Sequence, residues 1–182
     1  MSNAEVSVAY KVNNRANNIN EMAHTDIWVY FPTRDNTGLP FLVHGSFETA
    51  VSREKLMIPS AFNYVLFDEL GNLIVESLKD LKNRKMITQV FIYRVLIAAF
   101  RDEENNHTIP GLKTKVSECF KQGGYLPNKD GGYSAVNDVV MAVPFGIVDF
   151  FSGSLFAQSF TKVKGFVVFN NEREANFTEY FY

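Results

Sequence analysis

The sequence contains one cysteine, Cys119, so no disulfide can form within the chain. This usage is typical of proteins in a reducing compartment, and we expect a cytoplasmic protein. Nowhere do apolar residues form an uninterrupted run of roughly 18, the length that a membrane-spanning helix needs. The N-terminus also lacks a basic stretch followed by an apolar one. The sequence therefore indicates neither secretion nor a membrane partner.

An excess of charge of one sign is also missing, because 18 basic and 20 acidic residues leave a formal net charge of −2. This balance does not favour a polyanion, so no nucleic-acid partner is indicated. The three histidines, His24, His44 and His107, are scattered, and no pair of residues has the spacing of metal ligands. Glycine loops of the kinds that bind nucleotide phosphates are absent too. We expect no metal site and no cofactor within this chain.

Aromatic residues, by contrast, are abundant. Apolar residues make up 46% of the sequence and aromatic residues 14%, with 17 phenylalanines, which argues against disorder. Residues 1–4 resemble the remnant of a cleaved expression tag. We expect a single α+β domain over 5–182, with its core at 5–100 and an extension of helices and a hairpin at 101–182. This domain is expected to be a fragment of a larger protein.

The first part of the chain predicts strands. Glu5 to Val12 alternates apolar side chains on one face, and Asp26 to Phe31 is dense in β-forming residues. The Asn-rich stretch Asn13 to Glu21 is predicted to be a loop. Pro32 to Gly38 has the composition of a turn, and Phe41 to Phe47 is predicted to be a third strand. An antiparallel β-meander is the simplest arrangement of these strands.

A long amphipathic helix is predicted after Ser60, which is the expected N-cap. Apolar side chains recur there at spacings of three and four residues, as a buried helical stripe requires. The stripe comprises Phe62, Val65, Leu66, Leu70, Leu73, Ile74, Ser77, Leu78 and Leu81. We expect this helix to pack against the meander.

The rest of the chain predicts further helices and a small hairpin. Thr88 to Arg101 is apolar nearly all round, as a buried helix or strand would be, and its length favours a helix. A third helix is predicted between Pro110 and Gly123-Gly124. Leu126 to Tyr133 has the composition of a turn. A fourth helix is predicted after Pro144, and a strand between Phe160 and Phe169.

Candidate catalytic residues have simpler structural explanations. Cys119 falls on the apolar face of the third predicted helix, where we expect a buried, inert thiol rather than a nucleophile. His44 is expected to be a packed or hydrogen-bonded histidine rather than a base. An enzymatic centre around His44, Glu48 and Arg53 is an alternative, although no residue spacing demands it.

The most distinctive stretch runs from Phe31-Pro32-Thr33 to Ser52-Arg53-Glu54-Lys55. It combines a strand ending in Phe-Pro, a turn, a strand ending in Phe and a Ser-Arg turn that contains Ser52. The first turn is formed by Thr37, Gly38, Leu39 and Pro40. This pattern resembles the segment that follows the ATP-binding domain in sacsin and related bacterial proteins. Those proteins belong to the GHKL ATPase superfamily, together with heat-shock chaperones and DNA gyrase.

The resemblance continues through Phe62-Asn63 and the long helix to about Leu81. A later family turn is similar to the stretch from Leu126-Pro127-Asn128 to Gly132-Tyr133-Ser134. The family's nucleotide site, with its ATP and Mg, lies upstream of this segment and has no counterpart here. The resemblance therefore implies no catalytic residue in the chain by itself.

The function that the resemblance implies is that of a middle, transducer-like domain. Such a domain packs on an upstream ATP-binding domain in cis, senses its ATP and relays closure to a protein partner or client. In the superfamily, the domain after the nucleotide site lends a basic residue to the γ-phosphate. Arg53, beside Lys55, is the candidate for this trans-acting phosphate contact.

Two other interpretations stay open. Arg53 is alternatively a surface arginine that pairs with Glu48 or Glu54, a common arrangement. The whole domain is alternatively a protein–protein interaction scaffold with no nucleotide role, in which phenylalanines form an exposed apolar patch.

Overall fold

The computed structural model describes the following residues: 4–23, 25–100, 109–127, 132–135, 139–142 and 165–168. The chain divides into two compact units, 1–116 and 117–182. The core expected at 5–100 lies within the first unit. Within the described ranges, no helix combines the length and the apolar character that a transmembrane span requires.

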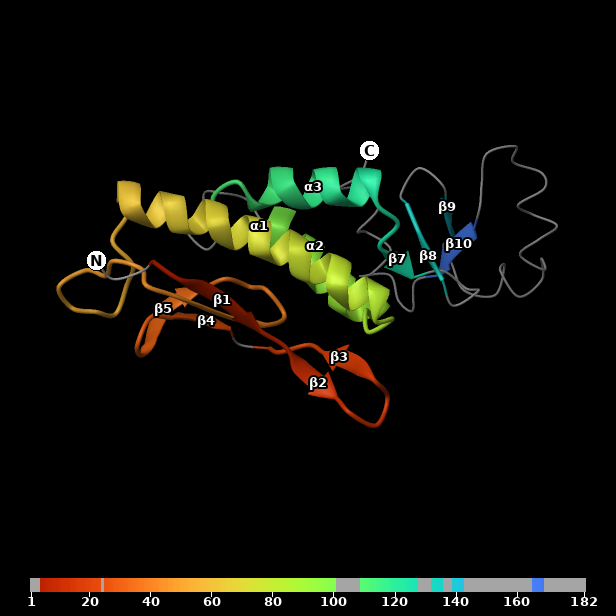
Figure 1. Ribbon diagram of the computed structural model, residues 1–182, viewed down its shortest axis with the longest axis horizontal. Helices are drawn as coiled ribbons and strands as arrows, with labels where there is room; N and C mark the ends of the chain where they lie inside the picture. The colour runs from red at the N-terminus through yellow and green to blue at the C-terminus, as the bar shows by residue number, and fades with distance from the viewer. Residues whose placement is uncertain are drawn as a thin grey trace. The chain divides into compact units, whose positions relative to one another are not determined.

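A four-stranded sheet forms the N-terminal part of the first unit (Figure 1). In spatial order its strands are β1 (Val6–Ala9), β6 (Leu42–Gly45), β4 (Asp26–Trp28) and β5 (Pro32–Asn36). Neighbouring strands pair antiparallel, except that β4 and β6 run parallel. The sheet is therefore mixed, whereas a simple meander would place β6 at the edge, next to β5.

Two segments that were predicted to be irregular form strands. β3 (Asn18–Asn20), in the Asn-rich stretch, pairs antiparallel with β2 (Lys11–Asn13). Asn13 Oδ1 accepts hydrogen bonds of 3.1 and 3.2 Å from two backbone N–H groups in the intervening turn. Asn17 adopts a φ of 49°, a left-handed conformation that asparagine tolerates better than most residues. The asparagines thus build a hairpin turn, and the prediction of a loop throughout this stretch was wrong.

The stretch Pro32 to Gly38 is the second such segment. Its first part forms β5 as far as Asn36, at the edge of the sheet, and the turn begins only after that residue. Proline is tolerated here because an edge strand does not need every backbone N–H for pairing. The turn prediction was therefore wrong for the first part of this stretch.

The predicted long helix is α1 (Ala61–Asn83), and its N-cap is Ser60 as expected. Ser60 Oγ accepts a hydrogen bond of 3.1 Å from the backbone N–H of Asn63. The buried stripe comprises Asn63, Leu66, Phe67, Leu70, Gly71, Ile74, Leu78 and Leu81. Phe62 and Val65, which were expected to face inward, are 42% and 62% exposed. Asn63 and Phe67 occupy the inward positions of the first turns instead.

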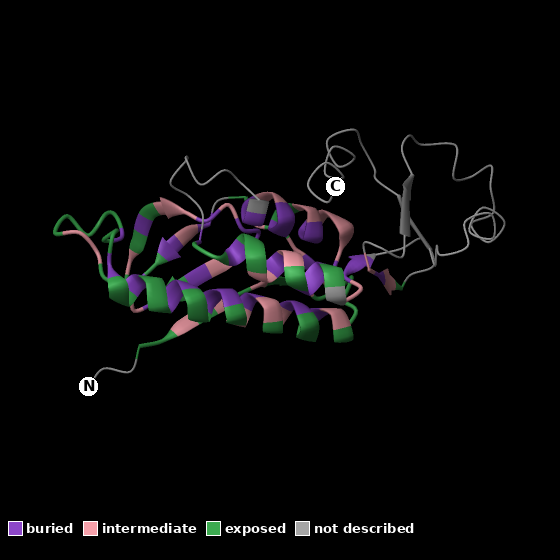
Figure 2. Ribbon diagram, turned by 90° about the horizontal axis from the view of Figure 1, so that it is seen from above, coloured by how far each residue is buried: buried purple, intermediate pink, exposed green. Residues whose placement is uncertain are grey.

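The helix α2 (Gln89–Phe100) confirms the helical prediction for the second apolar segment. With α1 it lies over one face of the sheet (Figures 1 and 2). Three rings join this layer to the strands: Phe91 of α2 lies 6.1 Å from Phe41 and 5.9 Å from Tyr10, and the Tyr10 and Phe41 rings are 4.7 Å apart. The α+β fold class is confirmed, with a core of aromatic rings between sheet and helices.

Burial raises the pKa of Tyr10 to about 12 from the usual 10.0, although the hydrogen bond between its hydroxyl and that of Ser77 acts in the opposite direction. Because the folded-state pKa is the higher one, the stability linked to the neutral hydroxyl is fully present below pH 10. It is lost as the pH rises from 10 to about 12.

We expect the wild type to lose about 2 kcal/mol of unfolding free energy relative to Tyr10→Phe over this window. Phenylalanine cannot ionise, so the difference between the two proteins isolates Tyr10 from every other titrating group. Urea denaturation at a series of pH values measures it. If the difference in unfolding free energy between the two proteins does not change with pH, the Tyr10 hydroxyl is not buried as described.

The remaining elements follow the predicted order: α3 (Leu112–Gln122), then β7 (Leu126–Pro127) paired antiparallel with β8 (Tyr133–Ser134). β9 (Val139–Ala142) and β10 (Gly165–Val168) pair in parallel. The third helix and the small hairpin are thus confirmed. The predicted helix after Pro144 lies outside the described residues, and the predicted strand near the C-terminus is described only over β10.

Cys119 of α3 is buried, as expected for a structural thiol. The ring of Tyr125 lies 5.3 Å from that of Phe120. Burial and, next, a hydrogen bond with Cys119 raise the pKa of the Tyr125 hydroxyl. The thiol therefore belongs to a small packed cluster of the second unit.

Candidate functional site

The residues singled out after the third predicted strand form an exposed loop, residues 49–56, between β6 and α1. Thr49 and Leu56 form an antiparallel bridge at its neck. Inside the loop, the backbone N–H of Ala50 donates to the Lys55 carbonyl at 2.9 Å, and the N–H of Arg53 donates to the Ala50 carbonyl at 2.8 Å. Side chains 51–55 are all exposed. The 49–56 loop is thus hydrogen-bonded within itself and presents its side chains to solvent.

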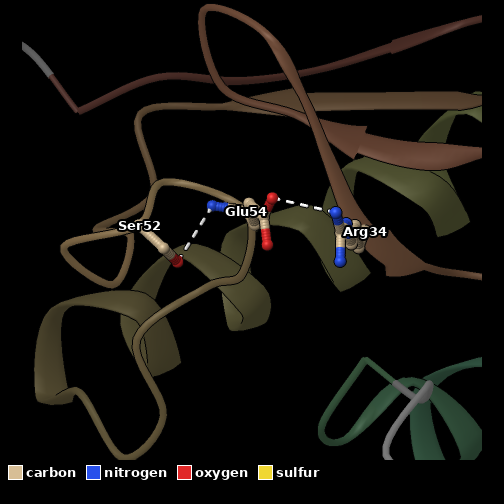
Figure 3. Close-up of polar contacts among 3 residues, drawn as sticks. All are labelled: Arg34, Ser52 and Glu54. Atoms are coloured by element: carbon tan, nitrogen blue, oxygen red, sulfur yellow. Dashed lines mark hydrogen bonds and ion pairs between the residues drawn. The ribbon is translucent and has the colours of Figure 1, made fainter.

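Strand β5 braces the 49–56 loop from one side (Figure 3). Arg34 Nη2 lies 2.9 Å from Glu54 Oε1, and the Arg34 backbone N–H donates to the Glu54 carbonyl at 2.6 Å. Asp35 Oδ2 accepts a 2.6 Å hydrogen bond from the backbone N–H of Leu56. Ser52 Oγ accepts from the Glu54 N–H at 3.4 Å (Figure 3). The edge strand therefore holds the loop by both backbone and side-chain contacts.

The first turn of α1 holds the same loop at its base. Asn63 Nδ2 donates to the carbonyls of Glu48 and Met57, both at 2.9 Å, and its Oδ1 accepts from the Glu48 N–H at 2.7 Å. The Glu48 carboxylate accepts a 2.6 Å hydrogen bond from the Ser60 hydroxyl. Asn63 itself is buried. The sequence did not predict Asn63 as a site residue. Its position three residues after the N-cap Ser60, at the start of the helical stripe, is a signal that its amide could anchor the preceding loop.

Arg53 lies near the tip of the loop with a φ of 60°. This left-handed conformation costs a non-glycine residue about 1 kcal/mol, and residues held in it cluster at functional sites. Within the described part of the chain, no hydrogen bond or ion pair holds the side chains of Arg53 and Lys55. The two carboxylates considered as partners are engaged elsewhere, Glu54 by Arg34 and Glu48 by Ser60. Both cations are therefore available to another molecule.

The turn formed by Thr37, Gly38, Leu39 and Pro40 has a structural role. Thr37 Oγ1 accepts from the Leu39 N–H at 3.1 Å, and Thr25 Oγ1 donates to the Leu39 carbonyl at 2.6 Å. Gly38 has a φ of 68°, which glycine adopts without a steric cost. Leu39 and Pro40 are buried. This turn sends the chain from the edge strand β5 into the interior strand β6, and it lies in sequence before the loop rather than within it.

His44 does not join the loop in a catalytic arrangement. Its side chain is exposed, and its Nδ1 lies 3.4 Å from Ser7 Oγ on the neighbouring strand. No hydrogen bond or ion pair among the described residues connects His44 with Glu48 or Arg53. No cluster of potential metal ligands occurs in the same ranges. The alternative of an enzymatic centre around these three residues gains no support from the geometry.

Comparison with known proteins gave no relative: no family model, no curated protein and no solved structure matches this chain. The arrangement of the 49–56 loop is therefore the main guide to function. It presents the exposed side chains of Arg53 and Lys55 on a braced support, while the carboxylate of Glu54 between them pairs with Arg34.

Proposed function

We propose that this chain is a middle, transducer-like domain of a sacsin-like or heat-shock-chaperone-like GHKL ATPase. In this role it couples the ATP state of an upstream domain to a protein partner or client. The observation that carries the proposal is the state of Arg53, an exposed guanidinium that has no carboxylate partner in the described part of the chain, on a loop held from two sides. The sequence resemblance to sacsin-like proteins identifies the expected anion as the γ-phosphate of ATP.

An arginine presented in this way suits a phosphate. Its planar fork donates two parallel hydrogen bonds to phosphoryl oxygens, and such charge-assisted bonds are stronger than neutral ones. The contacts of Glu54 and Leu56 with β5 limit the motion of the loop, so less entropy is lost when an anion binds. Lys55 adds a second positive charge nearby. Arg53 would thus stabilise charge that develops on the γ-phosphoryl oxygens, while ATP and Mg are held by the upstream domain.

The base of the loop supports a relay. Asn63 and Ser60 at the start of α1 hold Glu48, so a displacement of the loop toward a phosphate would pull on the first turn of this helix. The helix extends from Ala61 to Asn83 and is buried along one stripe, so it would move as a rigid body. Such a shift would carry the nucleotide state across the domain.

The test is ATP turnover by the protein that contains this chain together with its ATP-binding domain. We expect Arg53→Ala to lower kcat by about tenfold to a thousandfold, with a smaller change in KM, because the contact strengthens as charge develops. Arg15→Ala, at an exposed arginine in the β2–β3 turn, is the matched control. Normal turnover by Arg53→Ala would exclude the phosphate contact, and turnover by this chain alone would exclude the transducer.

A scaffold without a nucleotide role is the second candidate, and the exposed apolar side chains Val51, Met57 and Ile58 favour it. The same assays separate the two functions. A scaffold predicts that partner binding is unaffected by ATP and by Arg53→Ala.

A further inference from the structure

The two edge strands of the four-stranded sheet, β1 and β5, differ in how they are protected. An open edge offers unpaired backbone N–H and C=O groups to another chain, and proteins usually cover or interrupt such edges. β5 begins with a proline and pairs irregularly with β4. It is also covered by the 49–56 loop, since the Arg34 N–H donates to the Glu54 carbonyl. In the part of the chain that the structure describes, β1 has none of these three protections.

The backbone groups of β1 that point away from the sheet are those of Val6 and Val8. The Glu5 carbonyl accepts a 3.0 Å hydrogen bond from the N–H of Ser46, which continues β6. In an antiparallel ladder alternate residues exchange hydrogen bonds with the neighbouring strand, so the odd-numbered residues of β1 bond to β6. Val6 and Val8 therefore present their N–H and C=O groups at the open edge, where no described residue binds them.

A charged side chain lies at each end of this edge. Residues 5–11 alternate without a break between exposed and half-buried side chains, which indicates that the strand continues through Tyr10 into β2 (Figure 1). Glu5 and Lys11 therefore lie on the same exposed side, with only a serine and an alanine between them on that side. Neither charge has an ion-pair partner within the described ranges. The edge thus has an anion at one end and a cation at the other.

We propose that β1 pairs antiparallel with β1 of a second copy of this chain, about a two-fold axis, so that the two sheets become one continuous sheet. With Val8 at the axis, the backbone groups at the open edge bond to those of the other copy. The same register places Glu5 opposite Lys11 of the partner subunit at both ends. Opposite charges directly across an antiparallel pair stabilise it. The order of charges is thus complementary to itself when a second copy pairs antiparallel.

This pairing leaves the proposed phosphate contact open. β6 and β4 lie between β1 and β5, and the 49–56 loop is held by β5 at the far edge of the sheet. The dimer therefore uses neither Arg53 nor Lys55, and we expect Arg53→Ala to leave it unchanged. The inference goes beyond the proposed function, and either can fail without the other.

The first test is sedimentation velocity of the full chain from about 1 μM to 1 mM. We expect a monomer–dimer equilibrium with a Kd of about 1–100 μM, because a contact between two short strands is at the small end of protein interfaces. Val6→Pro removes an N–H at the open edge without removing a hydrogen bond to β6, and proline is tolerated at the first residue of a strand. We expect it to weaken the dimer by about tenfold. Far-UV circular dichroism verifies that the variant is folded.

Charge reversal tests the register. Glu5→Lys and Lys11→Glu each place like charges opposite each other at both ends, and each is expected to weaken the dimer by about threefold to thirtyfold. The double variant restores opposite charges and is expected to restore the dimer. Glu118→Lys, at an exposed glutamate on α3, is the matched control and leaves the equilibrium unchanged. Because all three replaced side chains are exposed, these variants test the proposal even if Val6→Pro does not fold.

Amide hydrogen exchange distinguishes this pairing from a dimer formed elsewhere on the molecule. Exchange at Val8 is expected to slow as the protein concentration rises, whereas exchange at Ser7, whose N–H already faces β6, is expected to stay unchanged. A chain that is monomeric up to about 1 mM overturns the proposal. A dimer whose double variant shows no rescue, or whose exchange at Val8 does not depend on concentration, overturns it too.

Discussion

Replacing Phe41 by alanine is expected to lower the free energy of unfolding by about 3–5 kcal/mol, a large part of the stability of a domain this size. Phe41 is fully buried, and its ring lies 4.7 Å from that of Tyr10 and 6.1 Å from that of Phe91. Alanine would remove the ring that joins the strands to α2. A cavity would stay behind, because β6 and the helix are each held by other contacts and cannot close it.

Urea denaturation at neutral pH measures this loss. Tyr30→Ala is the matched control, since it removes an aromatic ring that is 88% exposed, and we expect its effect to stay within about 0.5 kcal/mol. Equal losses in the two variants would mean that Phe41 is not at the centre of the core. A smaller m-value for Phe41→Ala would indicate that the variant no longer unfolds in one step.

Asn63→Ala is expected to cost about 2–4 kcal/mol, more than the loss of one ordinary hydrogen bond. The variant leaves the N–H and carbonyl of Glu48 and the carbonyl of Met57 without the amide that pairs with them. These groups lie where Asn63 is only 1% exposed, so water cannot easily replace the amide. The Glu48 carbonyl keeps its 2.9 Å hydrogen bond from the Met57 N–H, so much of the cost comes from the Glu48 N–H and the Met57 carbonyl, which lose their partner.

Asn72→Ala is the control for this variant. Asn72 is an exposed amide on the same helix whose Oδ1 accepts a hydrogen bond from Lys115, so its loss should cost less than about 1 kcal/mol. Amide hydrogen exchange gives a second readout. We expect exchange at Glu48 and in the 49–56 loop to accelerate in Asn63→Ala and to stay unchanged in Asn72→Ala. Unchanged exchange at Glu48 would contradict the anchoring role of Asn63.

The candidate site was predictable only in part. The motif directed attention to Arg53 and Lys55. Both lie on an exposed loop, and their side chains have no hydrogen-bond or ion-pair partner among the described residues. The residues that hold this loop, Arg34, Asp35 and Asn63, were not predicted. Arg34 and Asp35 come from a strand about 20 residues earlier in the sequence, and Asn63 is close in sequence but reaches the loop only because the chain folds back before α1. Which carboxylate pairs with which arginine depends on that packing.

The elements whose signal is local were determined by the sequence itself. The period of α1, its Ser60 cap, the helical state of α2 and the buried thiol of Cys119 all follow from neighbours a few residues apart. The first turns of α1 are an exception. Helical periodicity predicted that Phe62 and Val65 would be buried, but the first turn packs on the base of the loop and Asn63 is buried in their place.

The arrangement of the strands was decided by the tertiary structure. Short segments such as β3 and β5 have little local preference, and they become strands because partners complete their backbone hydrogen bonds. β6 enters between β1 and β4 because the buried turn after Asn36 directs the chain there, which no local pattern encodes. Helices form from contacts near in sequence, whereas sheets and the loops they brace form from contacts between distant segments. This difference explains why the helices of this protein could be predicted and its sheet and loop contacts could not.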